Sequence, residues 1–360
     1  MITPMTAAPV PPEQHVLGAS NKAALDACLE DLGQAQPGAL ALVLEVAGHA
    51  YAAAGTLVHF AAAGRRCGWV SPGCLEGDVL AAADAARAEG RVRLLDLDNR
   101  GLFDVFSGSG AGCRGRQRVL VLPLSMLAGL RPILASYREH DHALRLHYAA
   151  SGQLHAQTAG LKAEWSLPVE AEASLADVAG GAWALQWAPL PKVLICGAGP
   201  ESDILLPLLD QLGWRVDLVE PRPDWVTCMA LVERLLPATP VEGGGYDAVL
   251  VMAHHFGHDR EVLATLAGWP QLPRYIGLLG PERRREDLLA TLPGGVRERL
   301  HGRLESPAGL PLGGRGAAAI ALSLAARLQK YVQRLDQEQG QRCAPVPGSA
   351  VLLEDRDPPC

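Results

Sequence analysis

The sequence predicts an α/β protein with two domains: a small N-terminal α/β domain, and a C-terminal domain with a Rossmann-like, doubly wound parallel sheet. Two observations lead to this fold class. The chain has 360 residues, about twice the length of a typical domain, and 49% of them are hydrophobic, which is enough for ordinary globular cores. In the C-terminal half, short apolar runs alternate with helix-like segments across short connections, as in parallel sheets covered by helices.

The N-terminal domain is predicted over residues 20–124. Apolar side chains at helical spacing predict a helix over 21–32, and residues 75–89 are predicted to form an alanine-rich helix. Apolar runs predict strands at 39–46, 56–60, 67–70, 92–97 and 118–122. A glycine-rich stretch, 101–115, separates the last two of these strands.

Residues 125–190 carry a weaker pattern, and we interpret them as a middle or linker region that packs on one of its neighbours. In this region, residues 126–140 favour a helix, and residues 143–154 and 160–167 favour the two strands of a hairpin.

The Rossmann-like domain is predicted over residues 191–335. Its strands are expected at 193–196, 216–219, 248–252 and 275–279. Its helices are expected at 200–212, 225–236, 260–266, 281–292 and 315–335. The polar, proline-rich residues 336–360 are predicted to form a mobile tail.

Composition argues against several classes of protein. The formal net charge of −7 does not favour a nucleic-acid surface, and no apolar window approaches the roughly 20 residues that span a bilayer. The N-terminal residues lack the basic start and apolar core of a signal peptide. Eight cysteines without a CxxC pair do not favour structural zinc or a disulfide framework. We therefore expect a cytoplasmic protein with reduced thiols.

The first strand of the predicted Rossmann domain runs into Gly197-Ala198-Gly199. Glycines in such a turn let backbone amides approach a pyrophosphate at the positive end of the next helix. Glu220 follows the second strand, where an acid would take ribose hydroxyls. The third glycine of the dinucleotide fingerprint is missing, however, and Asp203 lies in the first turn of the predicted helix, where its charge would repel a phosphate. Two interpretations stay open: a Rossmann scaffold that binds nothing at this turn, and NAD(P) binding.

Two cysteine turns stand out in the N-terminal domain. Gly73-Cys74 lies where a turn enters a helix, and the amides and helix dipole there favour an anion or a metal-bound thiolate. Gly112-Cys113-Arg114 belongs to a glycine-rich loop whose amides can wrap phosphates and whose arginine can hold an anion. The alternative for each cysteine alone is a buried, inert thiol.

Three histidines and an aspartate, within residues 254–259, directly follow a predicted core strand. Ligands collect at the carboxyl ends of parallel strands, so His254 is a candidate ligand-binding residue. Metal binding is one interpretation, although the spacing matches no standard zinc motif. Helix capping by Asp259 is the alternative. Three consecutive arginines, 283–285, form either a solvated helix face or a phosphate clamp.

As a set, these segments resemble the XdhC/CoxI family, the accessory proteins of molybdenum hydroxylases such as xanthine dehydrogenase. The matching segments occur in one order between about 38 and 327: 73–79, 110–113, 197–200, 212–216, 220–223, His254, 275–285, 307–310 and 320–323. The sequence departs from the family pattern at Pro72, in the stretch 48–55 and near 311–319, which indicates a divergent branch.

The resemblance implies a protein that binds the molybdenum cofactor, in its mono- or dinucleotide form. It would hold the cofactor during sulfuration, with a cysteine desulfurase as partner, and deliver it to the apo-hydroxylase. It also implies a homodimer, and no turnover chemistry is required. Thiols and amides would approach the metal end, with Cys74 and Cys113 as candidate molybdenum contacts, and glycine turns and arginines would hold the anionic tail. The candidate cofactor-binding residues are Cys74, Cys113, Gly73, Gly112, Arg114, Gly197, Gly199, Glu220 and His254.

Two other functions stay open. A nicotinamide-dependent oxidoreductase is favoured by Gly197, Gly199 and Glu220, but the sequence lacks a convincing hydride-transfer set. Sulfur transfer through a persulfide on Cys74 or Cys113 overlaps with the accessory role.

Overall fold

The computed structural model describes residues 20–62, 64–98, 115–169, 181–222, 226–240 and 243–338. The chain divides between Pro189 and Leu190 into two compact units, which are described separately below. The predicted fold class is confirmed, with a mixed α/β architecture and a six-stranded parallel sheet in the second unit. The tail predicted at 336–360 lies almost wholly outside the described residues, as does the glycine-rich loop before residue 115.

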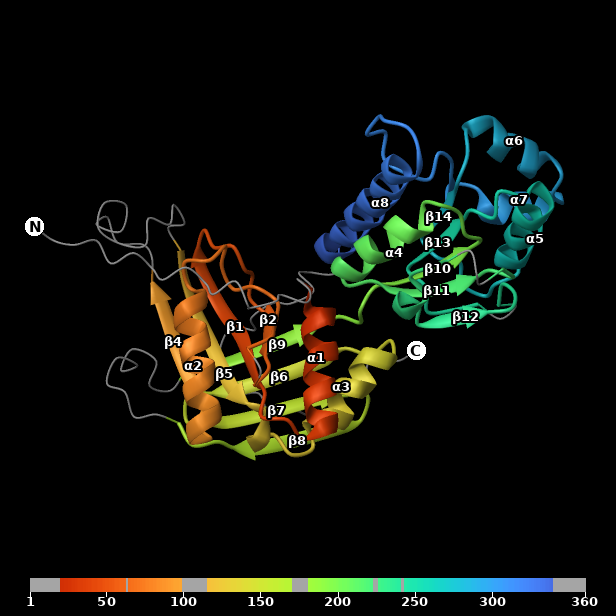
Figure 1. Ribbon diagram of the computed structural model, residues 1–360. Coiled ribbons are helices and arrows are strands. Elements are labelled where there is room, and N and C mark those ends of the chain that lie inside the picture. The colour runs from red at the N-terminus through yellow and green to blue at the C-terminus, as the bar shows by residue number, and fades with distance from the viewer. Residues whose placement is uncertain are drawn as a thin grey trace, which may run out of the picture. The chain divides into compact units, whose positions relative to one another are not determined.

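A five-stranded antiparallel sheet and helix α2 (Glu76–Glu89) form the first layer pair of unit 1 (Figure 1). Small and β-branched side chains on one face of the sheet, such as Val43 and Val119, pack against Val79 and Ala83 of the helix. The strand order is β3-β2-β1-β5-β4. The strands are β1 (Ala39–Gly48), β2 (Leu57–Phe60), β3 (Arg66–Cys67), β4 (Arg93–Asp98) and β5 (Gly115–Pro123).

Residues 125–189 also belong to unit 1, where they contribute a second, four-stranded antiparallel sheet in the order β8-β7-β6-β9. A short 3-10 helix, η2 (Leu124–Met126), leads into α3 (Leu130–Glu139), which packs against α1 (Asn21–Gln34). The sheet consists of β6 (Leu144–Ala149), β7 (Gln153–Thr158), β8 (Leu161–Ser166) and β9 (Ala182–Trp187).

The single strand expected over 143–154 is therefore wrong. Gly152 adopts a φ of 90°, and its amide donates to the carbonyl of Ala149 (2.8 Å), so the chain turns between β6 and β7. Such a left-handed conformation costs glycine little, and it ends the strand.

Unit 2 contains six parallel strands in the order β12-β11-β10-β13-β14-β15, which is the strand order of the doubly wound dinucleotide-binding fold. The strands are β10 (Lys192–Cys196), β11 (Arg215–Val219), β12 (Arg234–Leu236), β13 (Ala248–Val251), β14 (Tyr275–Leu278) and β15 (Leu304–Glu305). The helices are α4 (Ser202–Gln211), α5 (Phe256–Ala267), α6 (Glu282–Ala290), α7 (Gly294–Leu300) and α8 (Ala317–Glu338). The strand order reverses between β10 and β13, and ligands of such sheets bind beside this switch point.

The helix expected over 225–236 is wrong. A 3-10 helix, η5 (Met229–Leu231), is followed by the edge strand β12, whose Arg234 lies in register with Asp217 of β11. The Arg234 guanidinium donates to the Asp217 carboxylate (2.6 Å), so a buried charge draws this segment to the sheet edge. The short strands β12 and β15 and helix α7 were not expected from the sequence.

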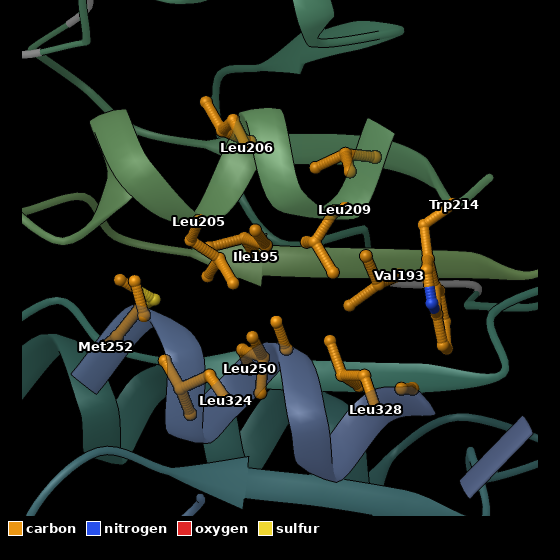
Figure 2. Close-up of a cluster of buried hydrophobic side chains, with 14 of the residues drawn as sticks. Val193, Ile195, Leu205, Leu206, Leu209, Trp214, Leu250, Met252, Leu324 and Leu328 are labelled. Atoms are coloured by element: carbon orange, nitrogen blue, oxygen red, sulfur yellow. The ribbon is translucent and has the colours of Figure 1, made fainter. Parts of the chain in front are cut away.

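Apolar side chains fill both faces of the unit 2 sheet. On one face, Val193, Ile195 and Leu250 pack against α4 and α8, and Figure 2 shows Leu205 and Leu324 reaching this layer from the two helices. On the other face, Leu194, Val249 and Ile276 belong to a second buried cluster with α5, α6 and α7. The sheet is therefore buried on both sides, which explains the continuous apolar runs in its sequence.

Candidate functional site

Cys74 lies in the turn between β3 and α2, directly before the helix. The buried carboxylate of Glu76 organises this turn, because it accepts hydrogen bonds from the backbone amides of Val70 (3.0 Å) and Ser71 (2.7 Å) and from the guanidinium of Arg66 (2.5 Å). The Cys74 side chain is partly exposed. Cys74 thus lies two residues before the first residue of α2, as the sequence predicts, and a contact between its thiol and the helix amides stays a prediction.

The backbone around Cys74 is open on at least one side. Gly73 has a φ of 133°, and a Cβ built at Gly73 or at Gly77 would have no neighbour within 4 Å. Other thiols of the chain are different: Cys28, Cys67 and Cys196 are buried, and burial raises the pKa of Cys196 to about 12. Cys74 is therefore not a buried thiol, and its reactivity stays a prediction.

The second predicted cysteine motif, Gly112-Cys113-Arg114, lies outside the described residues, but the residue that follows it does not. Gly115 opens β5 and pairs with Gly48 at the end of β1. A Cβ at Gly115 would collide with the carbonyl of His49, so only glycine fits at the root of this loop.

The Cys74 turn and the root of the Cys113 loop lie at the same end of the strands of the five-stranded sheet. Arg87, in the last turn of α2, donates to the carbonyls of Phe60 and Ala61, which lie beside the first residue of β1. The first turn of α2 therefore lies toward the opposite end of the strands, where β1 ends and Gly115 begins β5. The shared action of the two cysteines stays a prediction.

In unit 2, the glycine turn after β10 lies at the carboxyl edge of the sheet, next to the loop after β13. Gly197 has a φ of 97°, and a Cβ there would collide with the backbone of Ala253. Both the conformation and the close approach of two loops therefore require glycine at this position.

Glu220 follows β11, as predicted, but its carboxylate is engaged within the chain. It accepts hydrogen bonds from the amide of Ala198 (2.8 Å) and from the amide (2.9 Å) and side chain (2.8 Å) of Arg222. Burial acts to raise the pKa of Glu220, but these hydrogen bonds outweigh it, and the pKa is lowered. Glu220 thus fastens the glycine turn to the end of β11.

His254 lies at the switch point, directly beside the glycine turn. Its ring Nε2 is 2.9 Å from Oε1 of Glu201, and the backbone adopts a left-handed φ of 57°. The side chain of Glu201 is only 4% exposed, whereas that of His254 is 52% exposed. A buried carboxylate therefore holds an imidazole at the edge where ligands of this fold bind. Strained backbone at such a position is typical of functional sites.

The sequence analysis gave Glu201 no role. The sequence signal for Glu201 is its place two residues after the Gly-x-Gly turn. Its partner, His254, follows β13, which lies beside β10 in the Rossmann strand order. This pairing could have been found from the strand order, but not from spacing along the chain.

The other candidate residues near this edge serve the local structure. His255 caps α5 by accepting from the amide of His258 (3.3 Å). Asp259 is buried and pairs with Arg284 (2.6 Å), and Asp203 accepts from the amide and hydroxyl of Thr227 (2.9 and 2.8 Å). Among the residues that the structure describes, no three His, Cys, Asp or Glu side chains are placed to hold a metal ion.

Two family models match the chain: the XdhC Rossmann domain over residues 193–328, and the XdhC and CoxI family over residues 32–98. The chain therefore resembles the XdhC and CoxI family in both of its units. The resemblance found in the sequence is thereby confirmed, and the match to the XdhC Rossmann domain coincides with the six-stranded sheet. In the part of the chain that the structure describes, no helix is both long and apolar enough to span a membrane.

Two relatives match this chain over most of its length. It is 29% identical over 338 residues to a Bacillus subtilis (strain 168) protein whose name makes it a probable component of xanthine dehydrogenase, and the match covers 86% of this chain and 97% of the relative. A crystal structure titled as a xanthine dehydrogenase from Bacillus halodurans shares the fold, with a TM-score of 0.69 and 23% identity, over 88% of this chain and 98% of that chain.

Proposed function

We propose that this protein is an accessory protein of a xanthine dehydrogenase-type molybdenum hydroxylase. It binds the molybdenum cofactor, holds it during sulfuration and delivers it to the apo-enzyme. The matches to the two family models and the name of the Bacillus subtilis relative support this role. A cysteine desulfurase is the sulfur-donating partner, and the protein acts as a cytoplasmic homodimer.

The observation that carries the proposal is the Cys74 turn. A partly exposed thiol at the start of a helix, with open backbone at Gly73 and Gly77, suits a soft metal centre and its anionic ligands. The cofactor would supply a molybdenum atom on a pterin dithiolene, and the chain would supply the thiol, the amide donors and shelter from water. In unit 2, the imidazole of His254 is half-exposed, and its role in binding the cofactor stays a prediction.

Titration of the purified protein with molybdenum cofactor tests this proposal. Wild type should retain the cofactor through gel filtration, and oxidation of the protein fraction should release a fluorescent pterin. Cys74→Ser should lower retention by about tenfold, the size of one lost metal–ligand or charge-assisted contact. Cys228→Ser is the matched control, because Cys228 is also a partly exposed cysteine but lies in unit 2. Failure of wild type to bind the cofactor would contradict the proposal.

Sulfur transfer is a related role of the same residue. After incubation with a cysteine desulfurase and cysteine, mass spectrometry should show whether Cys74 or Cys113 gains one sulfur atom. A labile, reductant-sensitive adduct on Cys74 would support a persulfide intermediate, and its absence would leave cofactor holding as the whole function.

A further inference from the structure

The space over the second glycine of the Rossmann turn is filled by the protein itself. In dinucleotide-binding folds, this glycine lets the pyrophosphate approach the backbone. A Cβ built at Gly199 would lie 2.6 Å from Oε1 and 2.9 Å from Oε2 of Glu201, and 2.8 Å from Nε2 of His254. The bare backbone of Gly199 therefore makes room for a carboxylate and an imidazole of this chain.

The Glu201 carboxylate is held in this position by His254 and is not a helix cap. Glu201 is the N-cap residue of α4, yet its side chain makes no capping hydrogen bond. It instead pairs with His254, whose left-handed backbone is strained and must be stabilised by its surroundings. The negative charge nevertheless lies at the positive end of α4, where a bound anion would otherwise be stabilised.

Main-chain donors of the turn are also engaged. Pro200 has no N–H. The three residues before it donate to acceptors of the chain: Gly197 to the carbonyl of Val219 (2.8 Å), Ala198 to the carboxylate of Glu220 (2.8 Å) and Gly199 to the hydroxyl of Ser202 (3.2 Å). A pyrophosphate at this turn would meet a carboxylate and find the amides of all three residues already bonded.

We propose that Glu201 determines the ligand specificity of unit 2. Its carboxylate occupies the pyrophosphate position of the Rossmann turn as a built-in anion, and it closes this turn to dinucleotides such as NAD and NADP. The inference goes beyond the proposed function and does not depend on it. We assign the exclusion of dinucleotides to Glu201 and not to Asp203, because the Asp203 carboxylate already accepts hydrogen bonds from the amide and hydroxyl of Thr227.

Calorimetric titration of the full-length chain with NAD⁺ and with inorganic pyrophosphate tests this inference. Wild type should show no saturable binding of either probe. Glu201→Ala removes the charge and opens the space over Gly199, and it should bind both probes at least ~tenfold more tightly than wild type. Asp203→Ala is the matched control, because it removes one carboxylate from the same helix turn without opening the pyrophosphate position.

Three outcomes would overturn the proposal. These are NAD⁺ binding to wild type as tightly as to Glu201→Ala, no gain in the folded variant, and an equal gain in Asp203→Ala. Circular dichroism establishes that each variant is folded. If Glu201→Ala does not fold, Glu201→Gln preserves the side-chain volume, and it should still bind pyrophosphate more tightly than wild type; no gain there would also overturn the proposal.

Discussion

Glu76 is the residue on which the Cys74 turn depends most. Its carboxylate is the only hydrogen-bond acceptor that the structure gives the Arg66 guanidinium, whose Nε and second amino group have no partner among the described residues. Arg66 is 2% exposed and stacks over the ring of Trp69 (4.1 Å to the ring centroid). The positive charge is thus buried and relies on Glu76.

We expect Glu76→Gln to lower the free energy of unfolding by about 3–5 kcal/mol, because it leaves the Arg66 charge without its counter-ion. Urea denaturation measures the loss. Asp78→Asn is the control: Asp78 is exposed in the same helix turn, and its loss should cost only about 0.3–1 kcal/mol through the helix dipole. Equal losses in the two variants would contradict this account of the turn.

Asp217 provides the corresponding buried charge in unit 2, on the strand next to the sheet edge. Its fully buried carboxylate accepts from Tyr246 (2.7 Å) and Arg234 (2.6 Å) and lies 3.2 Å from the ammonium of Lys192. Burial acts to raise the pKa of Asp217, but these partners outweigh it and the pKa is lowered. The resulting stabilisation is complete above the unfolded-state pKa of about 3.9 and is lost as the pH falls toward the lower folded-state pKa.

Asp217→Asn should therefore lower the free energy of unfolding at pH 7 by about 3–5 kcal/mol, because it leaves the buried ammonium of Lys192 without this counter-ion. The variant should also lose less stability than wild type between pH 5 and pH 2 (about the acid range of carboxylates). Denaturation series at both ends of that range measure the difference. The exposed Glu286→Gln serves as control, and a wild-type pH profile in Asp217→Asn would disprove the assignment.

Among the elements, strands β6 and β7 carry a pH-dependent contact. His147 and His155 face each other across the two strands, with ring centroids 5.9 Å apart. Partial burial and the neighbouring His155 lower the pKa of His147. The folded state therefore takes up a proton on His147 less readily than the unfolded state, so stability is present above the unfolded-state pKa of about 6.5 and falls as the pH drops.

Between about pH 7 and pH 5, wild type should lose stability through this pair, and His155→Gln should reduce that loss by about 0.2–1 kcal/mol, the range of a cross-strand charge pair. Urea denaturation at the two pH values checks it. Glu164, 3.4 Å from His155, offsets part of the repulsion. His301→Gln, at an exposed position, should leave the pH dependence unchanged; the same change in both variants would refute the prediction.

For the molecule as a whole, each unit contains its own hydrophobic clusters. Residues 190–338 expressed alone should therefore fold cooperatively, with the circular dichroism of an α/β domain. In this fragment, Leu250→Ala should lower the free energy of unfolding by about 2–5 kcal/mol, because Leu250 is buried between the sheet and its helices. A fragment that stays unfolded would show that this core is insufficient by itself.

The sequence predicted those parts of the fold that rest on continuous apolar runs. Val193–Cys196 and Ala248–Val251 are recognisable because a parallel strand buried on both faces carries apolar side chains throughout. The strand β12 was missed because three residues with an exposed arginine carry no such pattern, and its place is fixed by Asp217, which lies 17 positions earlier in the chain.

The candidate site was predicted in part. Cys74, Gly197 and His254 were identified from local motifs, because turns, glycines and strand ends leave local signals. The pairing of Glu201 with His254 was not, since the two residues lie 53 positions apart and meet only once β10 and β13 are neighbours. The cofactor contacts assigned to Gly199 and Glu220 stay predictions, and both residues already contact other atoms of the chain.

The pairing of β4 with β5 has a practical consequence for engineering. Asp98 and Arg116 are register partners, so the two ends of the intervening segment lie side by side on the sheet. A short two-residue hairpin could be grafted there, excising Cys113 with its surroundings in one step, and foreign peptides could be displayed from the same scaffold position.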